Sequence, residues 1–219
     1  RFAMIKDIPT SSPLIDEKLK NDLSGIFQRL EDAVTIRAVI DMSTEKGNEL
    51  AGFLSVIASL SEKITLEMYA PQEPECPQEL DTQWLPVSGL YKNGQYSGIA
   101  FHGVPGGQEI NSFVLAVYNL SGPGQKLDMW TKRRIRKLTE KANIKVCVSL
   151  ACHHCPKVVT AAQQIAALND NIEAEMIDAG LYPDLVEKYG IERVPVIIIN
   201  DDRKYIGAKT IDELMDLVK

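Results

Sequence analysis

One stretch decides the fold, Ser149-Leu150-Ala151-Cys152-His153-His154-Cys155-Pro156. It follows a β-branched run at 144–150 that predicts a strand, and it leads into an apolar periodicity that predicts a helix over Cys155–Leu168. Two cysteines separated by two residues, at a turn from a strand into a helix, are typical of a redox-active dithiol. The sequence therefore predicts that these cysteines open and close a disulfide bond.

The two cysteines are expected to differ in exposure. A helix start carries unpaired N–H groups and a partial positive charge, which stabilise a thiolate, the attacking form of cysteine. Cys152 lies at the turn, so we expect it to be exposed and to attack a partner's disulfide. Cys155 lies in the first helical turn, so we expect it to be sheltered and to resolve the mixed disulfide. His153 and His154 lie between them, and a protonated imidazole there would help to stabilise the thiolate.

The same residues leave two metal-binding alternatives open. The four side chains from Cys152 to Cys155 are all competent zinc ligands, but consecutive residues cannot easily surround one ion tetrahedrally. The spacing of Cys147, Cys152 and Cys155 matches the start of a plant-type iron–sulfur motif, but no further cysteine follows. Dithiol chemistry is therefore favoured over a metal site.

Outward from the dithiol, the periodicity predicts the same order of elements twice. Each half has a helix, a strand, a second helix and a second strand, then a two-stranded hairpin and a final helix. The first half has helix 16–31, strand Val34–Asp41, a helix through Leu50–Leu60, strand Ile64–Tyr69, strands Leu85–Tyr91 and Tyr96–His102, and a helix through Ile110–Val117. The second half has helix 125–142, strand Ile144–Leu150, helix Cys155–Leu168, strand Ile172–Asp178, helix Pro183–Tyr189, strands Val196–Asn200 and Arg203–Ile206, and helix Thr210–Val218. This order predicts an α/β protein of two tandem thioredoxin-like folds packed as one unit, with a dithiol only in the second.

A proline precedes the hairpin in each half. Pro86 and Pro195 lie at the start of predicted strands, where proline loses no ladder hydrogen bond. An X–Pro bond adopts the cis form at a cost of only about 0.5–1 kcal/mol, and in a thioredoxin-like context we expect that form. Pro195 would then lie beside the dithiol and leave backbone groups free to pair with an extended substrate.

The composition and the net charge exclude several classes of function for this chain. The 219 residues are 45% hydrophobic and 25% charged with a net charge of −6, a globular composition whose acidic balance argues against nucleic acid as a partner. No apolar run has the length of a membrane span, and no signal-peptide pattern is present. Four cysteines are too few for a disulfide-stapled secreted fold, so a cytoplasmic protein is expected. Because the chain has no glycine-rich nucleotide motif, FAD and NAD(P)H are not expected to bind this segment.

Charge is divided unevenly along the chain. Residues 1–121 carry nine basic and 16 acidic side chains, a net charge of −7, whereas residues 122–219 carry 15 and 14, a net charge of +1. The change falls at Gly122-Pro123-Gly124. We therefore predict a leader or linker at 1–15, a thioredoxin-like fold without CxxC at 16–121 and one with CxxC at 122–219.

Three stretches together resemble one known family. They are residues 96–118, which contain Phe101, Gly103, Pro105, Gly107 and Glu109; Ser149–Pro156; and Val194-Pro195-Val196 with the following hairpin. From about residue 17 onward, the chain is similar to the N-terminal domain of the flavoprotein component of alkyl hydroperoxide reductase. The resemblance implies two tandem thioredoxin folds with a dithiol only in the second.

The resemblance also implies site residues and partners. Electrons would pass from NAD(P)H through a thioredoxin-reductase-like flavin domain or protein, which carries the FAD, to the dithiol and then to a peroxiredoxin-type disulfide. A homodimer could form through the full-length chain. Cys152 and Cys155 match the family's redox pair, and Pro195 matches its cis-proline.

Glu109 matches a family glutamate that the thiol-free half contributes near the dithiol. A carboxylate there would raise the thiol pKa and could shuttle a proton; without the resemblance, Glu109 is simply an acidic residue at a helix start. His154 departs from the family's usual residue between the cysteines, which puts the redox potential in question and leaves the reaction type unchanged.

The resulting hypothesis is a dithiol–disulfide oxidoreductase that relays electrons from a flavin reductase to a peroxiredoxin-type protein. Two alternatives remain open. One is a general protein disulfide oxidoreductase of the glutaredoxin or isomerase type, although such two-fold proteins usually carry a dithiol in each half. The other is a non-catalytic metal-binding module.

Overall fold

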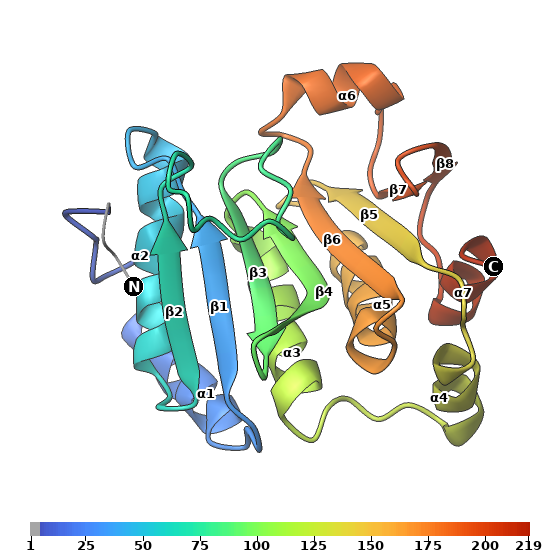
Figure 1. The fold of residues 1–219 in the computed structure, drawn as a ribbon, viewed down its shortest axis with the longest axis horizontal. Coiled ribbons are helices and arrows are strands. Elements are labelled where there is room, and N and C mark those ends of the chain that lie inside the picture. The colour runs from blue at the N-terminus through green and yellow to red at the C-terminus, as the bar shows by residue number, and fades with distance from the viewer. Residues whose placement is uncertain (1–4) are drawn as a thin grey trace.

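The computed structural model describes residues 5–219, which form one eight-stranded sheet (Figure 1). The strand order β2-β1-β3-β4-β6-β5-β7-β8 gives the first half one side of the sheet and the second half the other. The strands are β1 Val34–Val39, β2 Ile64–Tyr69, β3 Val87–Lys92, β4 Gln95–His102, β5 Ala142–Val148, β6 Ile172–Asp178, β7 Val196–Ile199 and β8 Arg203–Ile206. The helices are α1 Glu17–Phe27, α2 Glu45–Ser59, the 3-10 turn η1 Gly107–Glu109, α3 Ile110–Ser121, α4 Met129–Arg136, α5 Cys155–Leu168, α6 Pro183–Tyr189 and α7 Ile211–Leu217.

The same pairing pattern occurs in both halves. In the first, β1 pairs parallel with β2 and antiparallel with β3; in the second, β5 pairs parallel with β6 and antiparallel with β7. The halves join through the parallel pair β4 and β6, in which Phe101 lies opposite Met176. This arrangement confirms the predicted tandem thioredoxin-like folds.

The two folds share one hydrophobic core on the face of the sheet that carries most of the helices. Its buried side chains come from both halves, including Ile36 of β1 and Val158 of α5. Phe113 of α3 packs against Phe53 and Phe101, with ring centroids 5.4 and 5.0 Å apart. Each fully buried side chain of this size contributes roughly 1.5–3 kcal/mol. Because the core runs across the boundary between the halves, the two folds form one unit.

A network of polar and charged side chains spans the same boundary on the opposite face of the sheet. Nε2 of His102 on β4 lies 2.7 Å from Oε1 of Glu175 on β6, whose Oε2 lies 3.3 Å from Nζ of Lys145 on β5. Lys145 also reaches Oδ1 of Asp201 at 2.7 Å. Burial disfavours ionisation of Glu175, but the hydrogen bond and charge of His102 and the charge of Lys145 outweigh burial and lower the pKa of Glu175 to about 2. A buried carboxylate therefore stays ionised between partners from both halves.

Two predicted helices are too long. The helix predicted over 125–142 is α4, which covers only Met129–Arg136. Oδ1 of Asp128 accepts the N–H of Thr131 at 2.9 Å and starts the helix, and Nδ2 of Asn169 donates to the carbonyls of Ile135 and Leu138 and ends it. The chain beyond Leu138 must then extend into β5.

The helix predicted over 16–31 ends at Phe27. The N–H groups of Glu31 and Asp32 both donate to the carbonyl of Ser121, at 2.8 and 2.9 Å, and this turns the chain toward β1. The bounds predicted for the strands lie within one or two residues of those observed, the usual uncertainty of element ends.

The residues before α1 pack onto the first half. Residues 5–15 form no helix or strand, yet Ile5 and Ile15 are buried in the shared core. Residues 1–4 of the predicted leader lie outside the described residues. Within residues 5–219, no helix is long and apolar enough to cross a membrane.

Candidate active site

The two cysteines of the CxxC motif lie at the turn between β5 and α5. Cys152 is partly exposed and Cys155 is fully buried, and both are free thiols. The backbone N–H of Cys155 donates to Sγ of Cys152 at 3.2 Å. Pro156 occupies the first turn of α5, where its missing N–H has no intrahelical partner to lose. This donor and the helix start favour negative charge on the Cys152 sulfur.

Cys155 is held as a neutral thiol. Burial raises its pKa well above the usual value, and the contact with Cys152 and the negative charges of Cys152 and Glu109 raise it further. A hydrogen bond to the backbone of Ser149 opposes this only in part. Cys155 therefore needs a base before its sulfur can attack.

Glu109 is a buried carboxyl group whose charge reaches the dithiol. Its side chain is fully buried, Oε1 accepts the hydroxyl of Ser112 at 2.8 Å, and Oε2 has no hydrogen-bond partner in the described chain. Burial raises the pKa of Glu109 to about 7, against the lowering effect of Ser112. This carboxyl group is therefore poised to gain and lose a proton near neutral pH.

The turn that carries Glu109 is clamped to the loop before the dithiol. The N–H of Gln108 in η1 donates to the carbonyl of Leu150 at 2.9 Å. Gly107 has a φ of +54°, and a Cβ there would lie 2.6 Å from the same carbonyl oxygen. Only glycine fits this close approach, so the thiol-free half fixes the position of the loop that leads to Cys152.

Pro195 lies at the same end of the sheet as the dithiol. Val196, the next residue, is paired with Cys147 near the end of β5. The Val194-Pro195 and Leu85-Pro86 peptide bonds are both cis, as expected from the sequence. Pro195 is buried, and its carbonyl accepts the N–H of Gly207 at 2.9 Å.

His153 and His154 are exposed and lie between the cysteines in sequence. Within residues 5–219, neither ring has a hydrogen bond or an ion pair, and no group of three or more His, Cys, Asp or Glu side chains is placed to hold a metal ion. The iron–sulfur alternative needs Cys147, which is fully buried in β5, where burial raises its pKa to about 12.

Sequence reasoning missed two features of the site. One is the clamp between Gly107 and Leu150, although a glycine three residues before a predicted helix was a signal for a close backbone approach. The other is the hydroxyl of Ser112 on Glu109, which the spacing of three residues at a helix start could have suggested.

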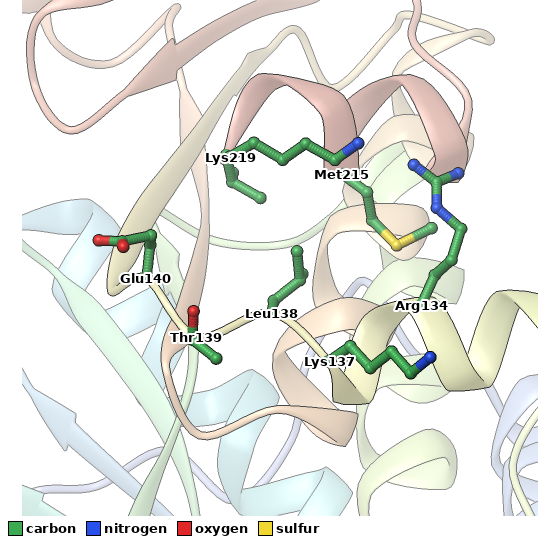
Figure 2. Close-up of a pocket in the computed structure, with 8 residues that line it drawn as sticks. Arg134, Lys137, Leu138, Thr139, Glu140, Met215 and Lys219 are labelled. Atoms are coloured by element: carbon green, nitrogen blue, oxygen red, sulfur yellow. The ribbon is translucent and has the colours of Figure 1, made fainter.

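A cavity of about 340 Å³ between α4 and α7 is a separate feature (Figure 2). Leu138, Met215 and Val218 line it together with the basic side chains Arg134, Lys137 and Lys219. Arg134 forms ion pairs with Asp212 and Asp216 of α7 at 2.9 and 3.0 Å. These pairs hold α4 against α7 and neutralise much of the charge of Arg134. No cysteine lines this cavity, and it is not part of the dithiol site.

Tandem thioredoxin-like folds with one CxxC pair at a helix start define a dithiol protein of the thiol–disulfide oxidoreductase class. The sequence pattern of the thioredoxin-domain family matches residues 142–219. A crystal structure of the NTD_N/C domain of alkylhydroperoxide reductase AhpF from Enterococcus faecalis is 40% identical, with a TM-score of 0.87, and the match covers 94% of this chain and 100% of that one. The chain belongs to the family of the N-terminal domain of the alkyl hydroperoxide reductase AhpF.

Other relatives are more distant or longer. The alkyl hydroperoxide reductase AhpF of Pseudomonas aeruginosa is 31% identical over 92% of this chain, and a Bacillus subtilis protein named NADH dehydrogenase is 27% identical over the same share. The chain spans 37% of the length of each of these curated relatives. A protein disulfide oxidoreductase from Aeropyrum pernix shares the fold, with a TM-score of 0.81 at 21% identity.

Proposed function

We propose that this chain is a thiol–disulfide shuttle that carries electrons from a thioredoxin-reductase-like flavin domain or protein to a peroxiredoxin-type disulfide. The observation that carries the proposal is the pair of a partly exposed Cys152 and a buried Cys155 at the start of α5, in a chain of the AhpF N-terminal-domain family. The flavin domain or protein would bind the FAD and NAD(P)H.

The exchange proceeds in two steps. The Cys152 thiolate attacks one sulfur of the partner's disulfide; that S–S bond breaks, a mixed disulfide forms, and the other partner sulfur leaves as a thiolate that takes up a proton. Cys155 then loses its proton, and its sulfur attacks Sγ of Cys152. The Cys152–Cys155 bond forms, the second partner thiolate leaves and is protonated, and two electrons have passed to the partner.

Glu109 serves the second step as the proton acceptor. Its unpartnered Oε2 and a pKa of about 7 suit a group that must take a proton from a buried thiol at neutral pH. When a reductase dithiol attacks the Cys152–Cys155 disulfide, the same carboxyl group returns the proton to Cys155. The exposed His153 and His154 add positive charge beside Cys152 whenever their rings are protonated.

Reconstitution of electron transfer tests the proposal. The chain is mixed with NADPH, a purified bacterial thioredoxin-reductase-like flavoprotein, an oxidised peroxiredoxin and peroxide, and NADPH consumption is followed. The wild-type chain should support consumption, Cys152→Ser should abolish it, and Cys155→Ser should trap a mixed disulfide with the peroxiredoxin that mass spectrometry detects. Cys76→Ser, a change of a thiol outside the pair, is the matched control and should keep full activity.

The same assay separates the alternatives. A chain that reduces insulin disulfides but passes no electrons to the peroxiredoxin would be a general protein disulfide oxidoreductase. Full activity in Cys152→Ser would contradict the dithiol mechanism. Stoichiometric zinc or iron in protein purified without oxygen would favour the metal-binding alternative.

A further inference from the structure

A groove of about 450 Å³ lies at the free edge of the second half. It is lined by Gly190, Glu192, Arg193, Val196, Lys204 and Ile206. These residues come from the segment that descends from α6 to β7 and from the β7–β8 hairpin (Figure 1). β8 is the last strand of the sheet, so its outer side has no neighbouring strand within the described chain.

The strand register places this groove at the same end of the sheet as the dithiol. Val196 is paired with Cys147 in β5 and with Ile206 in β8. β5 continues from Cys147 toward Cys152, and Val196 directly follows Pro195. The groove therefore begins directly beside Pro195, at the end of the sheet where β5 leads to Cys152.

The lining of the groove combines apolar surface with an excess of positive charge. Ile206 is 55% exposed, which is unusual among the large hydrophobic side chains of residues 5–219. Arg193 is exposed and forms no ion pair with any described residue. Nζ of Lys204 donates to the carbonyls of Tyr189 and Gly190 at 2.9 and 3.4 Å, which leaves its charge unneutralised.

The lining of the groove contains these two cations and one carboxylate, that of Glu192. The balance of charge therefore favours a ligand with a carboxylate of its own, and exposed Ile206 favours an apolar side chain beside it.

We propose that this groove binds the segment of a partner protein that flanks its disulfide, and that it selects segments in which a carboxylate lies next to an apolar side chain. The inference rests on the proposed function and adds the chemistry of the partner. The partner's carboxylate pairs with Arg193, and its apolar side chain contacts Ile206. The exchange itself stays at Cys152, so the groove decides which disulfides react fastest.

Synthetic peptides test this selection directly. Each peptide carries one cysteine joined to 2-mercaptoethanol as a mixed disulfide, flanked on both sides by Asp-Leu, Asn-Leu or Lys-Leu. The reduced protein supplies both electrons: Cys152 and Cys155 become a disulfide, and the peptide thiol and 2-mercaptoethanol are released. Initial rates are measured at low salt by chromatography of the released peptide thiol.

The wild-type chain should reduce the Asp-Leu peptide about fivefold faster than the Lys-Leu peptide, the change expected from a surface charge pair worth about 1 kcal/mol. Arg193→Glu should abolish or reverse this ratio. Arg136→Glu on α4 makes the same change of charge outside the groove and should keep the wild-type ratio. Arg193 is changed in place of Lys204 because Lys204 also donates to two backbone carbonyls, and the loss of Lys204 would therefore disturb the fold.

A second measurement tests the apolar contact. Ile206→Ser should lower the preference for an Asp-Leu peptide over an Asp-Ser peptide. Equal wild-type rates for the three charge variants, or an unchanged ratio in Arg193→Glu, would overturn the groove assignment while the proposed function stands. If none of the peptides is reduced by the wild-type chain, the proposed function fails, and this inference fails with it.

Discussion

The corresponding helices of the two halves, α2 and α5, have different side-chain atoms as hydrogen-bond acceptors at their starts. At the start of α2, Oγ1 of Thr44 accepts the N–H of Gly47 at 3.0 Å. At the start of α5, Sγ of Cys152 accepts the N–H of Cys155 at 3.2 Å. Oxygen caps one helix and sulfur the other, while the strands and the cis-proline around them are repeated. Both helix starts therefore offer a backbone N–H to a side-chain acceptor, and the residue that supplies the acceptor determines the chemistry.

The charges next to the two helix starts differ as well. In the first half, hydrogen bonds from the hydroxyl and the N–H of Ser43 lower the pKa of Asp41, so an ionised carboxylate lies beside this turn. At the start of α5 the nearby carboxyl group is Glu109, which comes from the first half and whose pKa burial raises to about 7. One helix start thus holds a permanent negative charge, and the other has a carboxyl group that exchanges its proton.

The largest expected effect comes from moving the dithiol to the first half. Met42→Cys with Glu45→Cys, in a Cys152→Ser/Cys155→Ser background, creates a CxxC pair at the start of α2. We expect its reduction of bis(2-hydroxyethyl) disulfide to stay at least about 100-fold below wild type, because the charge of Asp41 disfavours the thiolate and Glu109 stays beside the original site at α5. Activity within tenfold of wild type would mean that the helix start alone is sufficient.

The next effect tests whether the halves are one unit. Glu175→Gln should cost about 3 kcal/mol of unfolding free energy at pH 7, because it leaves Lys145 and His102 without their shared carboxylate. Glu173→Gln, on the same strand but partly exposed, is the control and should cost less than about 1 kcal/mol. Urea unfolding followed by circular dichroism measures both, and we expect one transition for the whole chain.

The sign of the pH dependence follows from the lowered pKa of Glu175. The stabilisation from the ionised carboxylate is present above its ordinary pKa and is lost as the pH falls toward 2. The stability difference between wild type and Glu175→Gln should therefore shrink in acid. A difference that stays constant between neutral and acidic pH would contradict the ion-pair account.

A smaller effect is expected at Glu109. Glu109→Gln should slow the release of partner from the mixed disulfide about tenfold, because Cys155 loses its proton acceptor. The wild-type rate of this step should rise as the pH increases through about 7, and the variant should lose that rise. Rapid-quench mass spectrometry follows the mixed disulfide, and Glu140→Gln on an exposed loop should leave the profile unchanged.

The same variant has an opposite effect on stability. Because the folded pKa of Glu109 is raised, the carboxyl group stabilises the fold below its ordinary pKa, and this contribution is lost as the pH rises through about 7. Glu109→Gln should therefore gain stability relative to wild type above neutral pH, by up to about 3 kcal/mol. Urea unfolding at acidic and alkaline pH measures the change, and a gain at acidic pH only would contradict this account.

The smallest effect is expected at the clamp. Gly107→Ala and Gly94→Ala both place a side chain at positive φ, at +54° and +75°, which should cost about 1 kcal/mol of stability in each, and the close approach to the Leu150 carbonyl should add a further cost in Gly107→Ala alone. Only Gly107 faces the Leu150 carbonyl, whereas Gly94 has open space around it. Disulfide reduction should therefore fall several-fold in Gly107→Ala and stay unchanged in Gly94→Ala. Equal rates in both variants would show that the thiol-free half does not position the dithiol loop.

Much of the fold was predictable because local patterns determine it. The alternation in strands such as Ile172–Asp178, the Asn93-Gly94 turn and the CxxC pair are all signals within a few residues. The helix predicted over 125–142 failed because a distant side chain, that of Asn169, takes the carbonyls that would have continued it. Such a contact leaves no trace in the local periodicity.

The candidate site was predictable only in part for the same reason. Cys152 and Cys155 follow from one short motif, but the place of Glu109 depends on the pairing of β4 with β6 across the boundary between the halves. Only a resemblance to a known family pointed to Glu109. The groove beside Ile206 was not predicted, because it arises where a loop and an edge strand meet.

The pairing of β4 with β6 also governs how the molecule can move. Continuous strand hydrogen bonding and a common core leave no hinge between the half that supplies the thiols and the half that supplies Glu109. A carrier that serves two partners in turn must then present the same rigid surface to each. Under the proposed function, any movement between an electron donor and an electron acceptor involves both halves together, so Glu109 moves with the two sulfurs.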